Sequence, residues 1–115
     1  NPKHPSCLWA AESSDNFENL VKHCASMIDE YYDRFGKTHK CKAVLRKIVE
    51  LYDASRFPTD KPTPIRMAMP EVYKTDNPVL SYRKYYASKP RMRYPKNKIP
   101  SWFREFRGDK DFQIV

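Results

Sequence analysis

The strongest structural signal in the sequence is residues 16–52, NFENLVKHCASMIDEYYDRFGKTHKCKAVLRKIVELY. Its apolar residues recur every three or four positions in two series. The first series is Phe17, Leu20, Val21, Cys24, Met27, Ile28, Tyr31 and Phe35, and the second is Cys41, Val44, Leu45, Ile48, Leu51 and Tyr52. This spacing gathers apolar side chains on one face of a helix. The stretch therefore predicts two amphipathic helices.

A short link separates the two series. Gly36 is suited to end the first helix, because glycine readily adopts the left-handed conformation found there. Thr38 is suited to cap the second helix, and Asp15 followed by Glu18 is similar to a capping box at the start of the first. A link this short makes neighbouring helices antiparallel. We therefore predict an antiparallel hairpin of helices 15–35 and 39–54.

The flanking sequence predicts shorter elements. Pro5 and Asn77-Pro78 fit helix starts, and they indicate helices near 5–13 and 78–88. Residues 55–76 contain Pro58, Pro62, Pro64 and Pro70, so we expect an ordered loop that packs through Phe57, Ile65, Met67 and Met69. Further prolines in the tail leave room for one short turn around Trp102. The predicted fold class is all-α, with a helical hairpin, flanking short helices and a proline-rich loop and tail.

The composition limits the class of protein. With 115 residues, 40% of them hydrophobic, the chain is expected to form one domain, 1–115, with a core. No apolar run is long enough to span a bilayer, so we expect no membrane partner. Three cysteines are an odd and sparse set, which favours free thiols and a cytoplasmic location. Cys24 and Cys41 are expected to be buried on helices.

The charge is distributed unevenly. The net charge is +8, yet residues 1–36 contain three lysines and arginines against six acidic residues, a net −3. The remainder of the chain therefore carries +11. Such asymmetry indicates a surface for a polyanion, either nucleic acid or an acidic protein. The alternative is that the excess lysine only keeps the protein soluble.

Residues 82–98 combine cations with aromatic residues and contain no Asp or Glu. The cations are Arg83, Lys84, Lys89, Arg91, Arg93, Lys96 and Lys98, and the tyrosines are Tyr82, Tyr85, Tyr86 and Tyr94. Cations neutralise phosphates, while exposed aromatic rings stack on unpaired bases. The segment therefore predicts nucleic-acid binding, on single or distorted strands at least as well as on a duplex. The alternative is that the tyrosines are core residues and the cations a solvated rim.

Two further groups contain residue types that can carry chemistry. His4, Cys7, His39 and Cys41 are zinc-ligand residue types, but their spacing is not that of a standard zinc motif, so we expect no metal and no cofactor. His4, Glu12, Asn16 and His39 lie at or beside predicted helix starts, with Trp9 nearby. They are the candidate catalytic residues, as acid, base and hydrogen-bonding groups. The alternative is that Glu12 and Asn16 supply helix-end hydrogen bonds and Trp9 is core.

Several short motifs together resemble a known family. They are His4-Pro5-Ser6-Cys7-Leu8-Trp9, Glu12-Ser13, Asn16-Phe17, Arg34-Phe35-Gly36-Lys37-Thr38-His39-Lys40, Ala68-Met69-Pro70-Glu71, Tyr73-Lys74 and Tyr82-Arg83-Lys84-Tyr85-Tyr86. Over most of residues 4–103 the chain resembles uncharacterised proteins of tailed-phage and marine viral genomes. The resemblance implies a phage origin, a setting of DNA metabolism in the host cytoplasm, and a missing amino-terminal portion. It implies no particular activity.

The leading functional prediction is a non-enzymatic, nucleic-acid-binding accessory protein of phage type. The first alternative is a phage enzyme acting on nucleic acid or nucleotides, such as a hydrolase, a glycosylase or a base-modifying protein. It requires His4, Glu12 and Asn16 to converge around a pocket. A third possibility is a factor whose basic surface binds an acidic host protein.

Overall fold

The computed structural model describes residues 1–90, 93–95, 98–107 and 113–114, the side chains of 107, 113 and 114 excepted. Contacts divide the chain into two compact units, residues 1–66 and 67–115. We call them unit 1 and unit 2 and describe each by itself. Both are built mainly of helices, which confirms the predicted all-α class.

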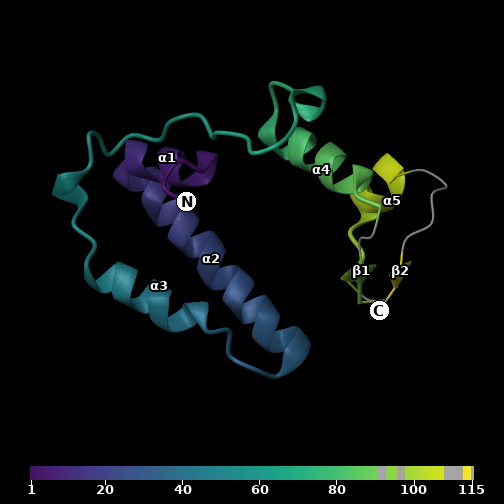
Figure 1. Cartoon of the computed structure of the whole chain (residues 1–115), viewed down its shortest axis with the longest axis horizontal. Helices are drawn as coiled ribbons and strands as arrows, with labels where there is room; N and C mark the ends of the chain where they lie inside the picture. The colour runs from purple at the N-terminus through teal and green to yellow at the C-terminus, as the bar shows by residue number, and fades with distance from the viewer. Residues whose placement is uncertain (91–92, 96–97, 108–112, 115) are drawn as a thin grey trace. The chain divides into compact units, whose positions relative to one another are not determined.

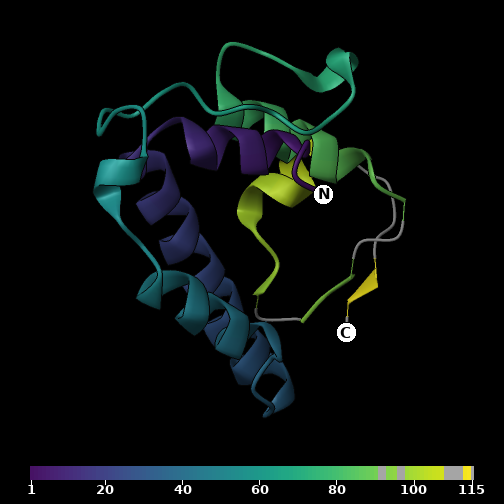
Figure 2. The ribbon, with the colours of Figure 1, turned by 60° about the vertical axis from the view of Figure 1, so that its left-hand side comes forward.

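Unit 1 contains the predicted helical hairpin. Helix α1 spans Pro5–Glu12, α2 spans Ser14–Phe35 and α3 spans Cys41–Glu50, followed by a 3-10 turn, η1, at Ala54–Arg56. Figures 1 and 2 show α3 returning beside α2 after the turn at Gly36, while α1 lies across the start of α2. The remaining residues of unit 1, in teal in both figures, run in extended form past α1.

The helix ends differ in detail from the prediction. The residue that caps α2 is Ser13, whose hydroxyl accepts a hydrogen bond from the Asn16 N–H, so the capping box proposed at Asp15 was wrong. Helix α3 begins at Cys41, where His39 Nδ1 accepts from the Cys41 N–H, so Thr38 is not its cap. In both places a nearer or better-placed acceptor takes the free N–H groups of the first turn.

The apolar core of unit 1 is small. Ala10 and Ile28 are buried, and the Phe17 ring stacks on Tyr52 with centroids 5.1 Å apart. Phe57 closes this aromatic group at 5.4 Å from Phe17, as expected for the loop. Much of the hairpin's apolar surface is uncovered within unit 1.

Two packing predictions were wrong for the same reason. Cys41 and Ile65 are exposed, although both were expected to pack. Cys41 belongs to the apolar series of its helix, and Ile65 is an apolar residue of the loop. Neither is covered by another element described in unit 1. Periodicity identifies the face of a helix and leaves open what covers that face.

Unit 2 packs two helices and a short strand pairing around one aromatic residue. Its elements are η2 (Glu71–Tyr73), α4 (Pro78–Ser88), β1 (Arg93–Tyr94), α5 (Ser101–Arg107) and β2 (Gln113–Ile114). Helix α4 packs on α5, and β1 pairs in parallel with β2. Phe103 is fully buried, with Tyr94 at 4.9 Å between ring centroids. Helix α4 and the helical turn around Trp102 match the prediction, and the strand pairing was not foreseen.

Gly36 provides the first testable prediction. It ends α2 with φ at +66°, and a Cβ added there would meet nothing within 4 Å. A side chain at Gly36 is therefore opposed by backbone conformation alone. We expect Gly36→Ala to lower the free energy of unfolding by about 1 kcal/mol. Gly36→Asn should cost less, because asparagine tolerates this conformation. Urea denaturation followed by circular dichroism checks both, and equal losses would contradict the assignment.

Candidate functional site

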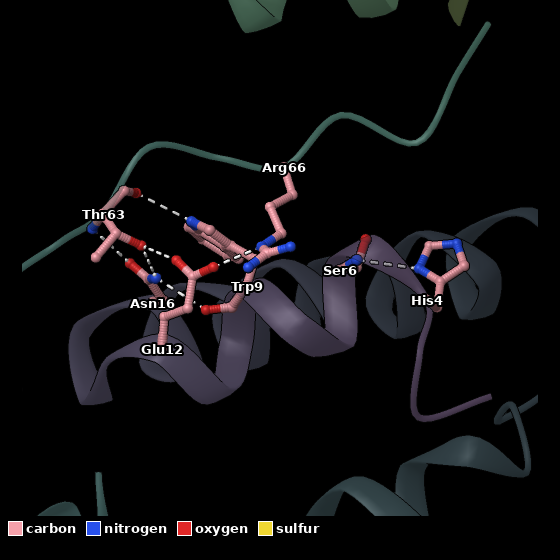
Figure 3. Close-up of polar contacts among 7 residues, drawn as sticks. All are labelled: His4, Ser6, Trp9, Glu12, Asn16, Thr63 and Arg66. Atoms are coloured by element: carbon pink, nitrogen blue, oxygen red, sulfur yellow. Dashed lines mark hydrogen bonds and ion pairs between the residues drawn. The ribbon is translucent and has the colours of Figure 1, made fainter. Parts of the chain in front are cut away.

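A polar cluster joins α1, the start of α2 and the extended segment of residues 59–66, called here the return segment. The Thr63 cluster consists of Trp9, Glu12, Asn16, Thr63 and Arg66 (Figure 3). All five belong to unit 1. The return segment also accepts a hydrogen bond at the Thr59 carbonyl from the Ser14 N–H, at 3.0 Å. The first turn of α2 thus obtains an acceptor from a distant part of the chain.

Asn16 lies at the centre of the Thr63 cluster. It is fully buried, and its side-chain N–H groups donate to the Trp9 carbonyl at 2.9 Å and to Thr63 Oγ1 at 2.6 Å. Its Oδ1 accepts from the Thr63 N–H at 3.1 Å. The Trp9 indole N–H in turn donates to the Thr63 carbonyl at 3.0 Å. The amide side chain therefore pairs with the return segment much as a neighbouring strand would.

Glu12 completes the cluster on its outer side. Thr63 Oγ1 donates to one carboxylate oxygen, and Arg66 Nε donates to the other, each at 2.5 Å. The hydrogen bonds from Thr63 and then Arg66 lower the pKa of Glu12; desolvation opposes them, and the charge of Arg66 adds a smaller lowering. Glu12 is therefore an ionised acceptor at neutral pH. Both of its oxygens are engaged in holding the return segment.

The two candidate histidines do not join this cluster. His4 lies at the opposite end of α1 from Glu12, where its Nδ1 accepts from the Ser6 N–H at 3.1 Å (Figure 3). His39 Nδ1 accepts from the Cys41 N–H at 3.0 Å, and its ring meets Tyr31 edge-on at 4.7 Å. Each histidine thus satisfies a free N–H group at a helix start.

This arrangement favours a structural role for the four candidate catalytic residues. A general acid must hold a proton near neutral pH, and the contacts of Glu12 act in the opposite direction. Within the described part of the chain, no group of three or more His, Cys, Asp or Glu side chains is placed to hold a metal ion. Sequence reasoning missed Thr63 and Arg66, because a threonine between two prolines carries no signal for a partner 47 residues away.

The basic-aromatic segment 82–98 lies in unit 2, and Arg83 is its best-defined cation. Arg83 is exposed on α4, with its guanidinium carbon 5.6 Å from the centroid of the Trp102 ring on α5. At this distance a guanidinium is attracted to the ring face. Lys84 is exposed beside it. Trp102 is a residue of this surface that sequence reasoning had placed only in a tail turn.

The tyrosines of the segment divide into packed and exposed residues. Tyr82 is half-buried, with its hydroxyl oxygen accepting from the Ala68 N–H at 3.1 Å. Tyr85 packs on Tyr73 at 5.4 Å, and the Lys89 ammonium lies 4.5 Å from the Tyr85 centroid. Tyr86 is exposed by 39%. Tyr82 and Tyr85 are therefore packed residues, while the Tyr86 ring, stacked 6.0 Å from that of Tyr82, remains partly exposed.

The remaining predicted contacts extend beyond α4. Arg93 is exposed on β1, Tyr94 is half-buried against Phe103, and Lys98 is half-buried. Arg91 and Lys96 were also predicted to contact phosphate, and they lie outside the described residues. Arg104, beyond the predicted segment, is a further exposed cation on α5.

Comparison with known proteins adds no family to these observations. No family model matches the chain, and no curated protein or solved structure matches it either. The resemblance to phage and marine viral proteins therefore stays a prediction. Among the described helices, none combines the length and the apolar character needed to cross a membrane.

Replacement of Asn16 tests the Thr63 cluster. Asn16→Ala removes three hydrogen bonds and leaves the Trp9 carbonyl and the Thr63 N–H without this partner, so we expect a loss of about 3 kcal/mol in unfolding free energy. The matched control is Asn19→Ala, on the same helix. Asn19 is exposed and its side chain bonds to Asp15, one turn earlier, so its loss should stay below about 1 kcal/mol. Urea denaturation measures the unfolding free energy of both variants. Similar losses in the two would argue against a central role for Asn16.

The pH dependence of stability tests Glu12. Its pKa in the folded protein lies below that of a glutamate in the unfolded chain, so ionised Glu12 stabilises the fold fully at pH values above the unfolded pKa. This stabilisation is lost as the pH falls through the lower, folded pKa. We expect Glu12→Gln to destabilise the protein most at neutral pH and progressively less in acid. Urea denaturation from neutral to acid pH measures the difference, with Arg66→Gln reproducing part of it. A difference that is constant with pH would contradict the prediction.

Proposed function

We propose that unit 2 binds single-stranded nucleic acid through the exposed face of α4 and the adjoining cations, without catalysing a reaction. The observation that carries the proposal is the pairing of Arg83 with the Trp102 ring beside the exposed Tyr86. This places a positioned guanidinium and an accessible aromatic ring on one small surface. Phosphate and base are the two groups that such a surface is suited to bind.

The contact with Trp102 supports a phosphate-binding role for Arg83. A guanidinium is planar, and stacking on an aromatic ring uses its face. The N–H donors at the edge of the guanidinium remain able to bind another group. Those donors match the geometry of a phosphate and can bind two of its oxygens at once. Holding the side chain in advance also lowers the entropy lost on binding. Arg83 is thus better prepared for this contact than a freely moving lysine.

Charge in unit 2 supports the same proposal. Residues 67–115 contain eleven lysines and arginines and five acidic residues, so this unit carries +6 of the chain's +8. No acidic residue falls within 82–98. A backbone of phosphates approaching α4 therefore meets no opposing carboxylate in that segment.

The position of Tyr86 favours single strands over a duplex. Tyr86 lies three residues after Arg83, so the two side chains neighbour each other on α4. A base can stack on an exposed ring only when it is not already stacked and paired in a helix. Arg83 and Tyr86 would then contact the phosphate and the base of nearby nucleotides.

A salt titration tests the proposal. Fluorescence anisotropy with labelled single-stranded oligonucleotides should give a log affinity that falls linearly with log salt, by about 0.7 per phosphate contact. The double variant Arg83→Gln/Lys84→Gln should flatten that slope by about 1.4. Tyr86→Ala should weaken binding about fivefold or more, while Tyr86→Phe keeps the ring and the affinity.

The matched control removes the same charge from unit 1. Lys22→Gln/Lys61→Gln replaces two exposed lysines outside the proposed surface and should leave the slope unchanged. An equal effect of both double variants would mean that net charge alone drives binding. Absence of binding at low salt, or binding insensitive to salt, would reject the proposal.

A further inference from the structure

The hairpin of unit 1 contains an apolar groove that the Thr63 cluster and the basic segment do not use. One hollow of about 430 Å³ lies between α2 and α3, and a second of the same volume is lined by α1 and Phe57 as well as by α2 and α3. They share Cys24, Leu45 and Ile48 in their linings, so they form one continuous depression. We call it the α2–α3 groove. It extends from His39 at one end to Phe57 at the other.

The edges of the groove are also apolar and exposed. Val44 on α3 and Met27 on α2 line it while remaining 58% and 59% exposed. Leu51 continues the α3 edge and is 68% exposed. Isolated exposed apolar residues are ordinary on a protein surface, but a contiguous apolar groove is typical of a binding surface.

The charges along the two edges differ. On α3, Lys40, Val44, Lys47 and Leu51 follow one another at four, three and four residues, so they lie along one side of the helix. This edge alternates exposed lysines with apolar residues. On α2, Glu30 and Arg34 lie one and two turns after Met27, and they bond to each other at 3.1 Å. Lys47 likewise lies 3.8 Å from Glu50, so each edge contains an ion pair, and Lys40, just before α3, gives the α3 edge its net positive charge.

We propose that the α2–α3 groove binds an amphipathic helix of another protein, with acidic residues on the flank that faces α3. The apolar stripe of such a helix would fill the groove and pack against α2 and α3. From Lys40 to Leu51 the α3 edge rises about 16 Å, so roughly three turns of the partner would lie along it. Acidic side chains on that flank would meet Lys40 and Lys47.

A second copy of this chain fits the groove less well. Its α3 would bring lysines to the positive edge, and the acids beside the groove, Glu30 and Glu50, are already paired with Arg34 and Lys47. Asp29 is on another side of α2, where it lines a separate hollow with Lys42. The groove thus lacks the self-complementary charges that a two-fold dimer interface requires.

The test uses the full chain and two designed peptides of about five helical turns. Both have leucines at helical spacing along one stripe, and they differ in bearing glutamates or lysines on the flanks. Anisotropy should show the glutamate peptide binding at least about tenfold more tightly at low salt, with the difference shrinking as salt rises. Size-exclusion chromatography with light scattering should show a monomer that binds one peptide.

Three variants assign the binding to the groove. Val44→Glu places a carboxylate in the lining and should weaken the glutamate peptide about tenfold or more. The control Val72→Glu makes the same change at a residue of unit 2 that is 82% exposed, and it should have no effect. Lys40→Glu/Lys47→Glu should reverse the preference in favour of the lysine peptide. Circular dichroism verifies folding, and the double variant leaves the apolar lining intact.

Each contrary outcome overturns the proposal. Equal binding of the two peptides would show contact without charge recognition. Equal effects of Val44→Glu and Val72→Glu would place the peptide outside the groove. A chain that binds neither peptide has its groove already filled or closed, and a stable dimer in that sample would identify a second copy as the occupant.

Discussion

The buried side chain of Asn16 is the constraint on which unit 1 depends. Its single amide group joins α1, α2 and the return segment through three hydrogen bonds. A polar group without access to water is stable only when it has partners, and it destabilises every arrangement that removes them. Asn16 therefore fixes where the return segment lies against α1, in a unit whose apolar core is too small to determine this by packing.

The Thr63 hydroxyl extends this constraint to the surface. It accepts from Asn16 and donates to Glu12, which also receives Arg66. The hydrogen bonds thus run in one direction, from a buried amide to an ionised carboxylate, and each strengthens the next. The same contacts that make Glu12 a good anchor make it a poor proton donor. These contacts argue against a role for Glu12 as a general acid.

Local patterns predicted the helices well and their tertiary partners poorly. The stripes from Phe17 to Phe35 and from Cys41 to Tyr52 identified both hairpin helices, because helical periodicity is a property of neighbouring residues. For Asn16 the sequence predicts a helix-end or catalytic role. The structure instead shows it bonded to Thr63, 47 residues away, which local pattern could not predict. In unit 2, the charge of residues 82–98 was visible in the sequence, while the packing of Tyr82 and the contact between Arg83 and Trp102 required the fold.

The prolines around Thr63 leave the return segment with few backbone N–H donors and little conformational freedom. Pro62 and Pro64 have no N–H group, so between residues 62 and 64 the backbone has one donor, and Asn16 accepts it. The same two rings restrict the backbone of the unfolded chain, so less conformational freedom is lost when the segment becomes ordered. Asn16, with the hydrogen bonds from Trp9 and Ser14 and those to Glu12, therefore holds a stretch of chain that has no strand partner. The proline rings thus restrict this part of the backbone, which elsewhere would be ordered by the hydrogen bonds of a β-sheet.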